Sequence, residues 1–431
     1  MKNSGIEWIG EIPDDWEIKT VKQLLFERIE KNMDYQTSTI LSLSAKDGIT
    51  LYDGENHSGN RPREDLSNYK VVYPQDIVVN SMNILSGAVG LSKYKGCVSP
   101  VYYIYYAKTN NCIEFLHYIF QCKQFQASLR GLGNGILIKE SENGNLNTIR
   151  MRIPSQKLSI QQLPYCVKDE QQKIADYLDK KCAAVDRLIE NQRAQIEKLK
   201  EYKQSVITEA VTHGLDLSSP LKDSGVEWLG KIPVKWNVNR LKYRTTYNDE
   251  ILKDSTPQEE IIRYVEIGSV SLENGVEKIE EYAFKDAPSR ARRIAKKDDI
   301  IISTVRTYLK AIASIKEEQL IVSTGFCVLR SNNQINNKYL EYFCKSNLFT
   351  EYVSANSYGI SYPAINASSL VAFHIIEPLI EEQQQIAAYL DKKCAEIDKL
   401  ISIKQQKIET LTEYKKSLIY EYVTGKKEVV S

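Results

Sequence analysis

An internal duplication limits the fold of this 431-residue chain more than any other feature. The stretch SGIEWIGEIPDDWEI at 4–18 returns as SGVEWLGKIPVKWNV at 224–238, with 8 of 15 positions identical. Residues 170–212 return at 382–424, with 26 identities in 43 positions. The segments between these markers differ far more. Strong repeats around variable segments predict two modules that share one architecture and carry different surfaces.

The second repeat is typical of a long helix. No Pro or Gly occurs from Asp169 to Thr212, and apolar residues recur at seven-residue spacing in both copies. These apolar residues would form a seam along one side of each helix. One position of the seam is polar in each copy, Gln192 in the first and Lys404 in the second. A polar residue in such a seam can fix the register of a helix pair at some cost in stability. We expect Gly214 and Gly425 to end the helices. The predicted interface residues are Leu178, Val185, Leu188, Leu199, Val206, Leu390, Ile397, Leu400, Leu411 and Leu418.

Such helices expose an apolar stripe unless they pair. Each spans on the order of 65 Å at ~1.5 Å per residue. In a chain that runs module, helix, module, helix, the two helices can pair with each other as an antiparallel coiled coil with approximate two-fold symmetry. A coiled coil for oligomerisation is the alternative. We therefore predict globular modules at 1–168 and 215–380, a central helix at 169–214 and a C-terminal helix at 381–431.

Both variable segments mix strand and helix patterns in the same order. In the first, 71–80 and 97–107 are typical of strands and 113–129 of a helix. In the second, strands are predicted at 298–305 and 320–330, and a helix at 338–353. The two segments align at an offset of 223–224, so that Gly135-Ile136 matches Gly359-Ile360. The predicted fold class is α/β (α+β), with two similar globular domains.

Polar side chains follow the aligned strand in each module, and they differ between the copies. Arg can bond guanine, Asn can bond adenine, and Ser or Thr tolerates several bases. Residues 285–310 also hold eight Lys or Arg against three Asp, a basic excess that suits phosphate contact, although a solvated basic turn is the alternative. The loops at 130–135 and 356–359 are further candidates. The predicted DNA-binding residues are Asn80, Ser81, Asn83, Lys93, Arg130, Asn134, Arg290, Arg292, Arg293, Ser303, Thr304, Arg306, Tyr308, Lys310 and Tyr358.

The composition of the chain and the absence of certain motifs exclude several classes of protein. The net charge is +1, so DNA binding must rest on local patches. No apolar run approaches the roughly 18 residues of a membrane span, and the N-terminus has no export signal, so a cytoplasmic location is expected. The eight cysteines form no CxxC pair, and we expect free thiols and no metal site. A P-loop and an NPPY-like tetrapeptide are absent, and no paired carboxylates recur in both copies. These absences favour recognition over catalysis.

One stretch suggests catalysis. Pro13-Asp14 followed by Glu17 and Lys19 contains the carboxylates and lysine of many Mg²⁺-dependent nucleases. The second copy replaces these groups with Val234, Asn237 and Asn239 and keeps the tryptophans and Ile-Pro. We therefore expect Trp8, Ile12 and Trp16 to pin an N-terminal arm onto an apolar surface. A stand-alone nuclease remains as an alternative.

Several motifs together resemble a known family. SGIEWIGEIPDDW, the strand and loop DIVVNSMN, its counterpart DIIISTVRTYLK, and EQQKIADYLDKKCAAVDRLI at each module's end are similar to DNA specificity subunits of type I restriction-modification systems. The resemblance covers essentially the whole chain. The family usually has a Pro-rich approach to the helix, which Glu377-Pro378 keeps. The first copy carries an insertion there.

The resemblance implies a function without catalysis by this chain. Each module would read one half of a bipartite DNA site, and the helices would span an unread spacer. The implied partners are double-stranded DNA, two modification subunits that methylate adenine, and two restriction subunits with motor and nuclease activity. S-adenosylmethionine, ATP and Mg²⁺ would be bound by these partners, and no cofactor by this chain. A bivalent DNA-binding adaptor or decoy is the alternative.

Overall fold

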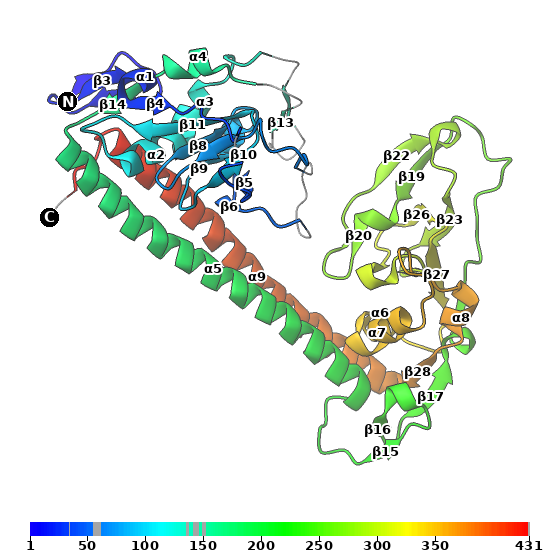
Figure 1. The fold of residues 1–431 in the computed structure, drawn as a ribbon. Coiled ribbons are helices and arrows are strands. Elements are labelled where there is room, and N and C mark those ends of the chain that lie inside the picture. The colour runs from blue at the N-terminus through cyan, green and yellow to red at the C-terminus, as the bar shows by residue number, and fades with distance from the viewer. Residues whose placement is uncertain (34, 55–61, 135–137, 141–145, 149–151, 430–431) are drawn as a thin grey trace. The chain divides into compact units, whose positions relative to one another are not determined.

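The computed structural model describes the chain except residues 34, 55–61, 135–137, 141–145, 149–151 and 430–431 (Figure 1). Within it, two compact units can be distinguished. The first unit consists of Met1–Gln192 and Gln406–Ser431, and the second of Arg193–Gln405. The mixed α/β fold class is confirmed, because each unit combines mainly antiparallel sheets with short helices and one end of each long helix.

A four-stranded antiparallel sheet of the same topology lies at the centre of both units. In the first unit its order is β4 (Leu25–Glu27), β11 (Tyr102–Ala107), β8 (Ile77–Asn80) and β9 (Val89–Leu91). In the second unit the order is β18 (Thr245–Tyr247), β27 (Phe326–Ser331), β24 (Ile300–Ser303) and β25 (Ile312–Ser314). The duplication seen in the sequence therefore extends to strand order.

Smaller sheets repeat as well. In the first unit, β1 (Lys2–Asn3) pairs with β2 (Glu11–Ile12), and β3 (Glu17–Thr20) with β14 (Gln162–Tyr165). Their counterparts in the second unit are β15 (Leu221–Asp223) with β16 (Lys231–Pro233), and β17 (Asn237–Arg240) with β28 (His374–Glu377). The β3–β14 and β17–β28 pairs join the start of each module to its end, immediately before each long helix.

The units differ in their remaining strands. The first unit has β5 (Leu41–Ser44) with β6 (Gly48–Leu51), β7 (Lys70–Val72) with β10 (Gly96–Val98), and β12 (Ile138–Glu140) with β13 (Leu146–Thr148). The second has a sheet in the order β22 (Glu280–Ala283), β19 (Ile261–Val265), β26 (Gln319–Ser323) and β23 (Ala291–Lys296), and a hairpin of β20 (Val270–Ser271) and β21 (Gly275–Val276). These differences fall in the segments whose sequences diverge.

Two predicted helices are each broken in two. The helix expected at 113–129 is α2 (Ile113–Gln121) and α3 (Lys123–Ser128), separated by extended backbone at Cys122. The helix expected at 338–353 is α6 (Asn337–Lys345) and α7 (Asn347–Ala355), separated at Ser346, whose side chain caps α7. The apolar periodicity continues through both breaks, which is why the sequence predicts one helix.

Short helices complete the units, and a turn also divides one predicted strand. The strand expected at 71–80 is interrupted because Gln75 has a φ of +69°, and Asp298 has the same φ at the matching place. The remaining helices are α1 (Val21–Leu24), α4 (Ser155–Ser159) and α8 (Ala367–Val371), with single 3₁₀ turns at Ile84–Ser86, Glu227–Leu229, Leu241–Tyr243, Ile267–Ser269, Phe284–Asp286 and Thr307–Leu309.

Two long helices, α5 (Lys168–His213) and α9 (Ile380–Val423), each contribute one end to each unit. Figure 1 shows them packed side by side. In the first unit Asp186 pairs with Lys415 at 2.7 Å, and the Tyr177 and Tyr422 rings lie 4.6 Å apart. In the second unit Lys203 pairs with Asp398 at 2.7 Å. Partner numbers fall on α9 as they rise on α5, so the predicted antiparallel pairing is confirmed within the first unit.

The two cross-helix ion pairs are copies of one contact. Asp186 and Asp398 occupy the same position of the repeat, and so do Lys203 and Lys415. In the second unit the polar Lys404 also donates a hydrogen bond to Gln195 across the pair, at 2.5 Å. Gly214 and Gly425 follow the two helices with φ of +80° and +69°, as predicted for helix ends.

The predicted helix-pair residues divide into two groups. Leu178, Val185, Val206, Leu390, Ile397 and Leu418 are buried, and Leu199 and Leu411 are half-buried. Leu188 and Leu400, by contrast, are each 48% exposed. These two leucines occupy the same position in the two helices. They lie away from the seam because the seam is narrower than the apolar stripe in the sequence.

Repeated polar residues fix each module to its helix. The Trp16 indole donates to Glu170 at 3.0 Å, and the Trp236 indole donates to Glu382 at 2.8 Å. The next residue of the motif, Gln171, is fully buried; it accepts from the Cys112 amide at 2.8 Å and donates to the Cys166 carbonyl. Buried polar groups of this kind are costly unless all their partners are present.

The same docking contacts recur in the second unit. Gln383 accepts from the Asn336 amide at 2.9 Å and donates to the Pro378 carbonyl. Tyr118 donates to Asp179 at 2.5 Å in the first unit, as Tyr342 does to Asp391 at 2.7 Å in the second. The repeated Glu-Gln-Gln and Tyr-Leu-Asp residues thus form the docking surface between module and helix.

Candidate nucleic-acid interface

One end of the sheets in the second unit gathers most of the DNA-binding residues predicted for that unit. β24 ends there at Ser303, paired with Phe326 at the start of β27, and β23 begins there, with Ala291 paired to Ser323. Backbone hydrogen bonds join Thr324 to Arg290 at 2.9 Å and Thr304 to Gly325 at 2.8 Å. We call residues 290, 304–310, 324–325 and 357–363 the second strand-end surface.

The segment after β24 has an unusual backbone that the loop at 357–365 supports. Arg306 and Lys310 flank a single 3₁₀ turn, and both have left-handed φ, at +53° and +50°. The Arg306 amide donates to the Pro363 carbonyl at 2.8 Å, and the Thr307 hydroxyl bonds the Ser357 hydroxyl at 2.8 Å. Arg306 and Tyr308 are therefore held exposed on a fixed turn.

Several other side chains predicted to contact DNA make contacts within the protein. Ser303 is buried and donates to the Val305 carbonyl, and Thr304 donates to the Gly325 carbonyl at 2.9 Å. Half-buried Arg293 donates to Asn248 at 2.6 Å and to the Phe326 carbonyl, while Arg292 lies 4.9 Å over the Phe284 ring. The structure thus uses these four side chains to shape the surface.

The local basic excess is smaller than the sequence indicates. Lys285 pairs with Glu259 at 2.6 Å, Lys296 with Glu250 at 2.6 Å, and Lys297 with Glu318 at 3.4 Å. All three glutamates lie outside the 285–310 window, so the sequence count could not include them. Among the described residues, Arg290, Arg306 and Lys310 make no ion pair with a carboxylate. These three cations carry the positive charge of the second strand-end surface.

The first unit has the corresponding surface at the end of β8. Asn80 is paired there with Tyr102 of β11, and its side-chain oxygen accepts from the Met82 amide at 3.0 Å. Ser81 is buried and donates to the Val101 carbonyl at 2.6 Å. Asn83 is exposed beyond the strand end. We call residues 80–86 and 99–102 the first strand-end surface; Asn80 and Ser81 shape it and Asn83 is free to contact a ligand.

A cleft of about 860 Å³ opens on this surface. Its walls come from the strand end and from the hairpin of β5 and β6. The lining combines apolar side chains with hydroxyl, amide and guanidinium groups. Such a lining can accommodate a ligand that has an apolar face and a polar edge. The lining includes Leu41, Ser42, Leu43, Ser44, Tyr52, Arg63, Tyr69, Asn80, Met82, Asn83, Ser86, Ser99 and Tyr102.

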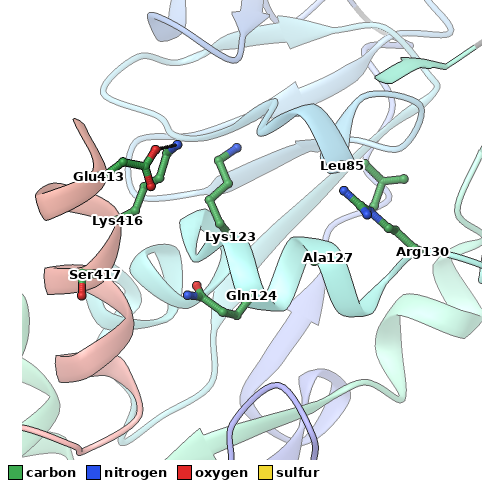
Figure 2. Close-up of a pocket in the computed structure, with 8 residues that line it drawn as sticks. All are labelled: Leu85, Lys123, Gln124, Ala127, Arg130, Glu413, Lys416 and Ser417. Atoms are coloured by element: carbon green, nitrogen blue, oxygen red, sulfur yellow. Dashed lines mark hydrogen bonds and ion pairs between the residues drawn. The ribbon is translucent and has the colours of Figure 1, made fainter. Parts of the chain in front are cut away.

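The three remaining predicted residues of the first unit lie at different places. Lys93 follows β9, whose pairing with β8 places Lys93 at the sheet end opposite Asn80. Asn134 is exposed and its backbone pairs with Arg152. Arg130 ends the segment after α3 and lines a separate hollow of about 430 Å³ (Figure 2). Lys93 is separated from Asn80 and Asn83 by strand direction, which the sequence does not give. Arg130 shares its hollow with Leu85 of the first strand-end surface, and Asn134 is linked to that surface through Arg152 and Ile153, whose amide donates to the Ser81 carbonyl at 3.0 Å.

The hollow beside Arg130 is basic. Figure 2 shows Lys416 of α9 paired with Glu413, at 2.6 Å, and Lys123 of α3 extending toward the same side. Burial lowers the pKa of Lys123, and the charge of nearby Lys416 lowers it further. At the matching places the second unit has Asn347 and Gln204, so this basic hollow belongs to the first unit alone.

The acidic stretch at the N-terminus makes local contacts. Asp14 binds the N-terminal amino group at 3.1 Å, and Glu17 pairs with Lys19 at 3.2 Å. Trp16 and Ile12 are buried, as predicted for the residues that pin the arm. Trp8 contacts Phe125 within the same unit. In the part of the chain that the structure describes, no group of three metal-ligating side chains occurs, and none of the helices is long and apolar enough to cross a membrane.

Comparisons with known proteins agree with this architecture. Residues 245–413 match the family model described as type I restriction modification DNA specificity domain. A putative type I restriction enzyme MjaX specificity subunit from Methanocaldococcus jannaschii is 24% identical over 436 residues, covering 97% of this chain and 95% of that protein. The MjaVIII specificity subunit from the same organism is 22% identical, covering 96% and 93%.

A solved chain shows the same fold. It comes from a structure of complex assembly and conformational transition of the type I R-M system and aligns with a TM-score of 0.65 at 14% identity. The alignment covers 96% of this chain and 98% of that chain. The family model and the full-length relatives thus make this chain similar to the DNA specificity subunits of type I restriction-modification systems.

Proposed function

We propose that this chain selects the DNA sequence on which a type I restriction-modification complex acts, each module reading one half of a bipartite site. One observation carries the proposal. The two units repeat their sheet order and their docking contacts, while the residues at the strand ends differ, Asn80 to Asn83 in one and Ser303 to Lys310 in the other. A constant scaffold with two different reading surfaces suits recognition of two different half-sites.

The chemistry of methylation and cleavage would lie on partner subunits. We infer that two modification subunits bind this chain and carry S-adenosylmethionine, and that two restriction subunits use ATP and Mg²⁺. The family relationship supports association with DNA and with such subunits. A bivalent DNA-binding adaptor outside restriction would use the same two surfaces. The contacts of Asp14, Glu17 and Lys19 give no support to a stand-alone nuclease.

The helix pair suggests how two identical partners could bind. Leu188 and Tyr414 are about half-exposed in the first unit, and Leu400 and Tyr202 in the second. Leu188 matches Leu400, and Tyr202 matches Tyr414, in the repeat. None of the four is needed inside the seam. Exposed apolar residues that recur at equivalent positions favour two equivalent docking surfaces, one for each copy of a modification subunit.

Arg306 provides a test of base reading. We expect Arg306→Ala to relax recognition at one position of one half-site and to cost roughly 1–3 kcal/mol of binding, as loss of a bidentate guanine contact does. The matched control is Lys310→Ala at the other end of the same turn, which should weaken binding equally for all sequences if it contacts phosphate. The measurement is a competition assay with duplexes that vary one base pair at a time. Uniform weakening by Arg306→Ala would contradict base reading by this residue.

A further inference from the structure

The loop at 358–364 of the second unit, here the tip loop, is closed at its base. The Tyr358 amide donates to the Ala364 carbonyl at 2.9 Å, and the Ala364 amide donates back to the Tyr358 carbonyl at 2.9 Å. Ala364 also bridges to Val305, and the Ile365 amide donates to the Thr304 carbonyl. Gly359, with a φ of +114°, allows the sharp turn. The tip loop is thus a fixed part of the second strand-end surface.

The tip loop exposes apolar side chains that a protein normally covers. Ile360 is fully exposed, Tyr358 is 84% exposed and Tyr362 is 62% exposed. Three large apolar side chains within five residues form one patch on a rigid support. Exposed apolar groups gathered in this way mark binding surfaces more often than scattered ones do.

Cations lie on the same strand-end surface as this apolar patch. The Arg306 guanidinium lies 4.8 Å over the Tyr362 ring, which fixes its position beside the tip. Lys310 ends the same turn as Arg306, and Arg290 is joined to that turn through Thr324, Gly325 and Thr304. An apolar tip with cations beside it is complementary to DNA, in which stacked apolar bases are flanked by phosphates on both strands. A purely apolar protein partner would not need the cations.

We propose that Ile360, flanked by Tyr358 and Tyr362, inserts between two stacked base pairs of the half-site that the second module contacts and kinks the duplex there. Proteins that deform DNA commonly use isoleucine, leucine or phenylalanine as such a wedge, with basic residues holding the bent backbone. The inference rests on the proposed function and adds a second mode of selection. Steps that unstack easily would be preferred even where no side chain bonds a base.

The sequence of the first module contains a related pair of residues. Gly135-Ile136 aligns with Gly359-Ile360, although residues 135 and 136 lie outside the part of the chain that the structure describes. The repetition of Gly-Ile within otherwise divergent segments is consistent with a wedge in each module. The structural argument, however, is made for the second module alone.

The test uses the full chain assembled with its modification subunits and a duplex carrying the bipartite site. 2-Aminopurine placed at each step of the half-site reports unstacking, and energy transfer between dyes at the duplex ends reports bending. The wild-type complex should raise fluorescence several-fold at one step and shorten the end-to-end distance. Ile360→Ala should abolish both signals and weaken binding about ten-fold or more. A mismatch at that step should restore the affinity of the variant.

Ile261→Ala is the matched control. Ile261 is 62% exposed and starts β19, at the end of that strand opposite the strand-end surface, so both signals should persist. Unstacking and bending unchanged in Ile360→Ala and in Tyr358→Ala would overturn the wedge while leaving the proposed function intact. If these variants lost the modification subunits but kept the DNA deformation, the tip loop would be a protein interface. That outcome would also overturn the wedge. No preference of the wild-type complex for the bipartite duplex would refute the proposed function itself.

Discussion

Replacing the first module with a copy of the second should convert the recognised site into a symmetric one. The exchange inserts residues 224–380 in place of 4–168. The junction contacts are preserved, because Trp236, Asn336 and Tyr342 would meet Glu170, Gln171 and Asp179, which are the same residue types as their own partners on α9. Since α5 and α9 are antiparallel, we predict a motif composed of the second half-site and its inverted repeat.

Adenine-methylation sequencing of cells that express the exchanged chain with the modification subunits gives the result directly. The original first half-site should disappear from the methylated motif, and the second should appear twice. As a control, exchanging only the hairpin residues 4–18 for 224–238 should leave both half-sites unchanged, since these residues dock the module. A motif in which both halves differ from the parent would contradict the division of reading between the modules.

Removing the exposed leucine and tyrosine from the helix pair should remove the modification subunits one at a time. Leu188→Ser with Tyr414→Ser should leave one modification subunit bound, and the four-residue variant with Leu400→Ser and Tyr202→Ser should leave none. Each central apolar contact of such an interface typically contributes about 2 kcal/mol or more, which is at least a 30-fold loss of affinity. The stoichiometry of co-purified complexes, measured by native mass spectrometry, distinguishes two, one and zero copies.

The control for this experiment is an exposed leucine outside the helix pair. Leu217 is 69% exposed in the segment after α5, and Leu217→Ser should retain both partners. The altered leucines and tyrosines are outside the seam, so circular dichroism should show unchanged helix content. Two copies still bound to the four-residue variant would exclude these residues as the docking surface.

The architecture could be predicted from the sequence because the sequence features that indicate it occur twice. The antiparallel helix pair follows from an apolar spacing that occurs in two helices separated by a module, and the shared order of elements follows from strand patterns at a constant offset. The breaks at Cys122 and Ser346 could not be predicted, since apolar periodicity continues through both. The sequence prediction does not include the role of Gln171 and Gln383, although their identity in both copies indicates a repeated polar contact.

The reading surfaces were harder to predict than the scaffold. Arg306, Tyr308 and Asn83 are exposed at strand ends, where the pattern of polar residues indicated them. Ser303 and Asn80 are also polar but are buried, because each is the last residue of its strand and is paired with a residue of the neighbouring strand. The pairing of Lys296 with Glu250 depends on contacts between distant segments. Ile360 carries no polar group, so a search for base-bonding residues passes over it.

The most direct test of the central claim is methylome sequencing of the host with and without this chain. The account predicts that adenine methylation at one bipartite motif is lost when the chain is deleted and returns when it is supplied again, while every other methylated motif is unchanged. Supplying the Arg306→Ala variant should restore methylation with one position relaxed. Methylation that is identical with and without the chain would contradict the claim that it selects the DNA sequence.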